Sequence, residues 1–160
     1  MSETYSDRFL MDILEEVTTF ACVGVSGNPI RPSYFVARFL SLRGYSIIPV
    51  NPNYFGKRLF GSEVRADLGG ISVDTQVDVV DIFRRSEEVP SIVEQALDRF
   101  PSLKVIWMQV GVANQYAATL ARDAGVKVIQ NRCPKIEHQR LYGELRMAGI
   151  NTGIVSSKLQ

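Results

Sequence analysis

The chain has 160 residues, of which 46% are hydrophobic and 22% charged, a composition typical of one globular domain spanning residues 1–160. Eighteen Lys and Arg against seventeen Asp and Glu leave a net charge of +1. General nucleic-acid binding is therefore not expected, because duplex binding uses a large basic excess. A membrane span is not expected either, since the longest strongly apolar run covers only residues 20–25.

The residues that commonly bind metals or form disulfides are few. The two cysteines, Cys22 and Cys133, do not form a CxxC pair, and the single histidine, His138, argues against a multi-histidine metal site. Residues 1–10 contain neither the basic nor the apolar segment of a secretory signal. These observations predict a protein of the reducing cytoplasm.

Short apolar runs alternate with amphipathic segments along the chain. Continuous apolar runs predict strands buried on both faces, and apolar residues at helical spacing predict the segments between them. The segment 54–70 is irregular, and we expect a loop there with one short strand or helix. In chain order the predicted elements are a helix over 9–17, a strand over 20–25, a helix over 34–42, strands over 45–50 and 77–83, a helix over 89–100, a strand over 104–108, a helix over 114–124, a strand over 126–129 and a helix over 136–147.

Strands separated by helix-length segments predict βαβ units with right-handed crossovers. The expected fold is α/β: a Rossmann-like, doubly wound, mostly parallel sheet of five or six strands, within a three-layer αβα arrangement. The strand order expected for such a sheet is 3-2-1-4-5, and its ligands bind outside the carboxyl ends of the strands. The polar loops after each strand are therefore the candidate site.

The loop after the first strand contains Gly24 and Gly27 and leads into a helix. Glycines let a backbone approach a phosphate, and a helix N-terminus attracts an anion. The spacing is neither GxGxxG nor a P-loop. A tight turn that needs Gly and Asn explains the same residues.

The second strand ends in Asn51-Pro52-Asn53, followed by Lys57. An NAD-binding fold usually carries an acid at this point, to hold the ribose hydroxyls. Neutral and basic groups are better suited to a phosphorylated ribose, because they do not repel its charge. The alternative is that Asn-Pro-Asn only forms a turn.

The remaining strand ends carry two arginines and a cysteine. Arg84 and Arg85 follow the third strand, where guanidiniums bind phosphate bidentately or lie solvated at a helix entrance. Cys133 follows the fifth strand and has only His138 as a nearby base, so a packed or ligand-contacting thiol is favoured over a nucleophile. His138 itself is expected on a helix surface, while Cys22 and Trp107 are expected in the core.

Six blocks of the sequence, from about Phe20 to Leu141, resemble the small stand-alone CoA-binding proteins. These are single Rossmann-like domains similar to the CoA-binding domain of the succinyl-CoA synthetase α subunit and of ADP-forming acyl-CoA synthetases. The blocks are VGVSGNP (23–29), RPSY (31–34), IPVNPN (48–53), VVDIFRRS (79–86), WMQVG (107–111) and NRCPKIE (131–137).

The resemblance implies a coenzyme A molecule bound across the carboxyl ends of the strands. It assigns the diphosphate to the first loop, the 3′-phosphorylated adenosine to the second, the adenine or pantetheine arm to the third, and the far wall to the fourth and fifth. The residues are, in that order, Gly24, Ser26, Gly27, Asn28, Arg31 and Ser33; Asn51, Asn53 and Lys57; Phe83, Arg84 and Arg85; and Gln109, Gly111, Asn131 and Cys133.

The expected function is binding of CoA or an acyl-CoA as a small-molecule ligand, without intrinsic catalysis. The synthetases use a phosphohistidine and a nucleotide-grasping partner, and here the sole histidine lies past the last strand. The alternatives are a nicotinamide-nucleotide-binding enzyme or redox sensor on the same fold, a mixed disulfide between Cys133 and CoA, and a purely structural subunit.

Overall fold

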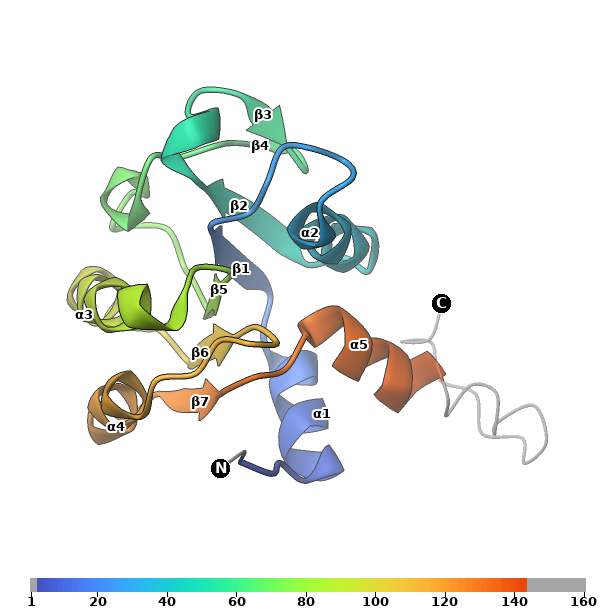
Figure 1. The fold of residues 1–160 in the computed structure, drawn as a ribbon, viewed down its shortest axis with the longest axis vertical. Coiled ribbons are helices and arrows are strands. Elements are labelled where there is room, and N and C mark those ends of the chain that lie inside the picture. Colours follow the sequence, from blue (N-terminus) through green and yellow to red (C-terminus); the bar gives the residue numbers. More distant parts are fainter. Residues whose placement is uncertain (1–2, 144–160) are drawn as a thin grey trace.

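Five short strands form one parallel sheet in the order β2-β1-β5-β6-β7 (Figure 1). The computed structural model describes residues 3–143. The strands are buried along almost their whole length, which explains why they appear in the sequence as mainly apolar runs, interrupted in β5 by the buried Asp81. They are β1 (Thr19–Val23), β2 (Ser46–Val50), β5 (Val79–Ile82), β6 (Val105–Met108) and β7 (Lys127–Ile129).

Helices cover both faces of the sheet and complete the predicted three layers. Ala21 and Val23 of β1 face the cluster built with α3 and α4, whereas Phe20 and Cys22 face the cluster built with α1, α2 and α5 (Figure 1). Trp107 and Cys22 are fully buried, as predicted. The helices are α1 (Asp7–Glu16), α2 (Pro32–Leu42), α3 (Val89–Arg99), α4 (Gln115–Asp123) and α5 (Pro134–His138), with 3₁₀ turns at Pro52–Tyr54, Leu68–Gly70 and Ser86–Glu88.

The expected strand order is wrong in one respect. With the five main strands numbered along the chain, the order is 2-1-3-4-5, so the third lies beside the first and not beside the second. The outer side of β2 is instead met by Arg65, which forms a single parallel bridge with Val50. A single bridge forms there because the segment 54–70 has no apolar run; it forms a small hairpin of β3 (Arg58–Leu59) and β4 (Ser62–Glu63).

The 2-1-3-4-5 order still contains a topological switch point. From β1 the chain crosses through α2 to β2, and from β5 it crosses through α3 to β6 on the other side. The two crossovers leave in opposite directions, so a crevice opens between the carboxyl ends of β1 and β5. The observed strand order therefore predicts a ligand at the carboxyl ends of the strands, as the expected order did.

The C-terminal part of the described chain differs from its prediction. α5 begins at Pro134 and continues as a π-helical turn over Gln139–Gly143, while residues 144–147 of the predicted helix lie outside the described residues. His138 is buried and not on the surface, because its ring packs against Phe39, Tyr45 and Tyr142. Within residues 3–143, no helix combines the length and apolarity that crossing a membrane requires.

Candidate ligand-binding site

A cavity of about 640 Å³ lies at the switch point, between the strand ends and the first turns of α2 and α5. Its volume is that of a typical small-molecule site. The predicted residues that line it are Gly24, Ser26, Arg31, Ser33, Asn51, Asn53, Phe83, Gln109 and Cys133, and the others are Pro32, Val36, Tyr54, Val110, Val112 and Ile136.

The loop between β1 and α2 is ordered by its own short side chains. Ser26 N–H donates to Oγ of Ser33 over 2.9 Å, and Asn28 N–H donates to Oγ of Ser26 over 2.9 Å. Ile30 N–H donates to Oδ1 of Asn28 over 3.0 Å. These bonds fold the loop over the start of α2, which opens with Arg31 at the N-cap and Pro32 in the first turn. The positive end of α2 and the guanidinium of Arg31 thus meet at the cavity.

Gly27 is required by a close contact with Tyr54. A Cβ atom at Gly27 would lie 2.6 Å from Cδ1 of the Tyr54 ring, closer than any carbon pair tolerates. The Tyr54 hydroxyl lies 3.3 Å from Oγ of Ser26 and ties the 3₁₀ turn after β2 to the first loop. Sequence reasoning missed Tyr54, because it falls in the segment that we expected to be irregular.

The amides after β2 hold the two loops together. Asn51 is buried, and its Nδ2 donates to the Val25 carbonyl over 3.0 Å while its Oδ1 accepts from Asn53 N–H over 3.0 Å. Asn53 and Tyr54 then face the cavity. Lys57 is exposed and lies on the loop beyond them, outside the cavity wall. The turn predicted for Asn-Pro-Asn is present, and it also presents polar groups to the cavity.

The two arginines after β5 are not aimed at the cavity. The Nη2 atom of Arg84 lies 2.8 Å from Oε1 of Glu88, and the Nε atom of Arg85 lies 3.2 Å from Oε2. These hydrogen bonds lower the pKa of Glu88. The Arg84 side chain lines a separate cavity of about 200 Å³ beside α3, whereas Phe83 lines the main one. Of the two alternatives considered for these arginines, neither included Glu88 as their partner.

Gly111 and Asn131, which were predicted for the far wall, are hydrogen-bonded to each other. Gly111 N–H donates to Oδ1 of Asn131 over 2.7 Å, and both residues have positive φ angles, +84° and +59°. This bond joins the loops after β6 and β7, and neither residue lines the cavity. The apolar side chains of Val110, Val112 and Ile136 form that part of the wall instead.

A carboxyl group lies beneath the cavity wall. Asp81 of β5 is fully buried beside Cys22, and Nε2 of Gln109 donates to its Oδ1 over 3.1 Å. Burial raises the pKa of Asp81 to about 8, against the opposing effect of the Gln109 hydrogen bond. No acidic residue is among the fifteen described residues that line the cavity itself.

Cys133 lies where α5 begins and is 6% exposed. Burial raises the pKa of its thiol, although the backbone amides of Ile136 and Lys135 favour the thiolate. His138, the only candidate base, packs into the aromatic cluster of Phe39 and Tyr142. This arrangement favours a neutral thiol in contact with a ligand over a nucleophile.

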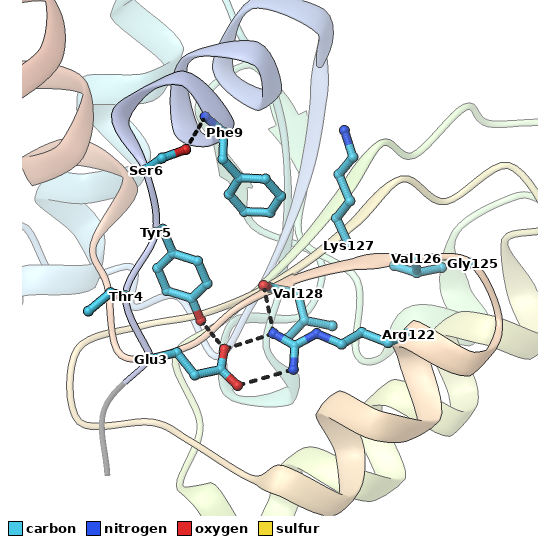
Figure 2. A pocket seen from close by; sticks show the side chains of 10 residues that line it. All are labelled: Glu3, Thr4, Tyr5, Ser6, Phe9, Arg122, Gly125, Val126, Lys127 and Val128. Carbon is cyan, nitrogen blue, oxygen red and sulfur yellow. Dashed lines mark hydrogen bonds and ion pairs between the residues drawn. The ribbon is translucent and has the colours of Figure 1, made fainter.

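A larger pocket, of about 960 Å³, lies at the edge strand β7 (Figure 2). Its floor carries an ion pair between Arg122 and Glu3, whose Nη2 and Oε1 atoms lie 2.7 Å apart, and the Tyr5 hydroxyl bonds to the same carboxylate. Arg122 holds the pKa of Glu3 at about 2. These groups satisfy one another, and Gln130, which follows β7, donates to both Tyr5 and Glu3. The pocket therefore lies along the open edge of β7, away from the switch point between β1 and β5.

The fold and the main cavity define a class: a Rossmann-like α/β protein with its cavity at the carboxyl ends of the sheet. Within that class, residues 18–139 match the family described as CoA binding domain, and the chain belongs to this family. The family expected from the six sequence blocks is confirmed.

The relatives are consistent with this membership. The chain is 33% identical over 129 residues to the uncharacterized protein YneT of Bacillus subtilis (strain 168), covering 81% of this chain and 91% of that one. The structure of cell-free ID.343 from Thermus thermophilus superposes with a TM-score of 0.79 at 31% identity, covering 86% of this chain and 100% of that one. A dinucleotide-forming acetyl-coenzyme A synthetase 1 of Ca. Korarchaeum cryptofilum, in its apo form, shares the fold alone, with a TM-score of 0.58 at 20% identity over 74% of this chain and 27% of that one.

Proposed function

We propose that this protein binds coenzyme A or an acyl-CoA in the cavity at the β1/β5 switch point, and that the chain performs no chemistry on it. The observation that carries the proposal is the cavity itself, which joins the first loop, the start of α2 and the turn after β2 in one protein of the CoA-binding family. The donors in its wall are hydroxyls, amides and one guanidinium, which suit a phosphorylated ligand.

The diphosphate is assigned to the start of α2. Arg31 and Ser33 flank it, and the helix dipole favours an anion at that point. The adenosine is assigned to the turn beside Asn53 and Tyr54, with Lys57 close enough along the chain to pair with a 3′-phosphate. The missing acid after β2 weighs against NAD, whose ribose hydroxyls need an acceptor.

The absence of catalysis is inferred from the state of the reactive side chains. Asp81 lies behind Gln109, the pKa of Cys133 is raised, and His138 is enclosed by aromatic rings. None of these groups combines access to the cavity with the protonation state that a base or nucleophile needs.

The proposal is tested by calorimetric titration with CoA, dephospho-CoA, NAD and NADPH. We expect binding of CoA, weaker binding of dephospho-CoA, and little of either nicotinamide nucleotide. Arg31→Ala should weaken both CoA forms, whereas Lys57→Ala should weaken CoA alone, by about fivefold for an exposed ion pair. Arg8→Ala, an exposed arginine on α1, is the matched control. Selective binding of a nicotinamide nucleotide over CoA would overturn the proposal.

A further inference from the structure

An apolar groove of about 440 Å³ runs between α2 and α5, outside the main cavity. Its walls are formed mainly by Phe35, Phe39 and Leu42 of α2 and by Ile136 of α5. Phe35 is 50% exposed, Leu42 63% and Ile136 52%, so large apolar side chains of the groove are exposed to water. Contiguous exposed apolar surface of this kind marks a binding site.

The groove adjoins the main cavity. Pro32 and Val36 from the first turns of α2, and Cys133 and Ile136 from the start of α5, line both spaces. A ligand that fills the cavity therefore reaches the groove at these four side chains. This shared boundary distinguishes the groove from an isolated apolar patch.

The two spaces differ in polarity. The cavity carries Ser26, Arg31 and Asn53, where phosphates are assigned, whereas Phe35, Phe39 and Ile136 of the groove are apolar. CoA carries its charges at the nucleotide end and its thiol at the end of an uncharged arm. The groove accordingly meets the thiol end, the position at which an acyl group is attached.

We propose that the groove binds the hydrocarbon chain of a medium-chain acyl-CoA, so that the ligand of this protein is a fatty acyl thioester and not free CoA. The proposal rests on the proposed function, since the groove receives only what the cavity positions. Burying the chain removes apolar surface from water on both sides, including that of Phe35 and Leu42.

The two cations at the groove are compatible with an apolar occupant. The Lys135 ammonium lies 5.5 Å from the centroid of the Phe39 ring and donates to Gln139, so its charge is held at the rim. Arg38 is exposed on the same side. Long basic side chains cover apolar surface with their stems while their charges stay in water.

The test is a calorimetric series of CoA, butyryl-, hexanoyl- and octanoyl-CoA with the full chain, below the concentrations at which the thioesters form micelles. A fully buried methylene contributes about fourfold in affinity. The groove is open on one side, so about half of that free energy, roughly twofold per methylene, is expected. Octanoyl-CoA, with four more methylenes, should therefore bind about sixteenfold more tightly than butyryl-CoA.

Variants assign the effect to the groove. Phe35→Ser and Leu42→Ser should each reduce the ratio of the butyryl-CoA to the octanoyl-CoA dissociation constant toward one. Tyr116→Ser, which removes an aromatic ring that is 64% exposed on α4, should keep that ratio. A ratio that persists equally in all three variants would overturn the groove assignment.

The other outcomes separate this inference from the proposed function. Binding of CoA with equal affinity along the series leaves the proposed function standing and overturns the inference. Tighter binding of succinyl-CoA than of butyryl-CoA also overturns it, because Arg38 and Lys135 would then recognise a carboxylate. Failure of every thioester and of CoA overturns both, whereas binding of octanoyl-CoA alone supports the inference.

Discussion

The Nε2 atom of Gln109 donates a hydrogen bond to Oδ1 of Asp81 over 3.1 Å, and this bond joins the cavity wall to a fully buried carboxyl group. The same Nε2 atom lies 3.4 Å from Oδ2 of Asp81, so the buried carboxyl group fixes the orientation of the Gln109 amide at the cavity wall.

Asp81 should make the stability of the protein fall as the pH rises. Burial raises its pKa to about 8, whereas a carboxyl group in an unfolded chain has a pKa of about 3.9. Between these values the folded state holds a proton that the unfolded state has lost. The contribution of Asp81 is therefore complete below about pH 4 and decreases by about 1.4 kcal/mol per pH unit up to about pH 8.

Asp81→Asn removes this contribution while keeping a side chain of the same shape. Urea unfolding at pH 5, 6, 7 and 8 should show the variant gaining stability relative to the native protein as the pH rises. Asp98→Asn, which changes an exposed carboxylate on α3, should follow the native protein. Parallel curves for native protein and Asp81→Asn would show that the carboxyl group ionises alike in both states.

Gly27→Ala should destabilise the first loop through its contact with Tyr54. The added Cβ would lie 2.6 Å from the ring, so the ring or the loop must move, at a cost of about 1–3 kcal/mol in the free energy of unfolding. The φ angle of Gly27 is not positive, and strain of the backbone therefore does not contribute. Urea unfolding measures the loss.

A double-mutant cycle checks the cause. In the Tyr54→Ala background the ring is absent, and Gly27→Ala should then change the free energy of unfolding by less than about 0.5 kcal/mol. If the cost of Gly27→Ala is the same in both backgrounds, the contact with Tyr54 is not its source.

The sequence predicted the parts of the site that depend on local rules. Gly24, Ser26 and Ser33 line the cavity because a strand, a short polar loop and a helix start follow directly in the chain. The strand order was not predictable, because no local sequence feature shows that β2 is an edge strand, met on its outer side only by the single bridge to Arg65. In the expected and in the observed order the first strand flanks the switch point, so the predicted location of the cavity is unaffected.

Contacts between side chains account for the rest. Arg84 and Arg85 were expected beside the ligand because guanidiniums bind phosphate, but Glu88 binds both of them. Tyr54 lines the cavity because Gly27 leaves room for its ring. The Glu88 pairs have the i,i+4 and i,i+3 spacing of local ion pairs, whereas the contact between Gly27 and Tyr54 joins two loops and cannot be inferred from spacing.

Cys133 should react slowly with alkylating agents and with CoA disulfide in the folded protein. Its thiol is 6% exposed, and burial raises its pKa, so that both access and thiolate population are reduced. We therefore expect modification by iodoacetamide at about pH 7.5 to be clearly slower in buffer than in urea.

Intact mass and peptide mapping over time measure both reactions and separate Cys133 from Cys22, which is also buried. Cys133→Ser removes the site and identifies any adduct on the other thiol. Unfolding in urea supplies the reference rate for each cysteine in the same chain. Rapid formation of a CoA adduct on Cys133 in the folded protein would contradict a merely ligand-contacting thiol and would favour a mixed disulfide as part of the function.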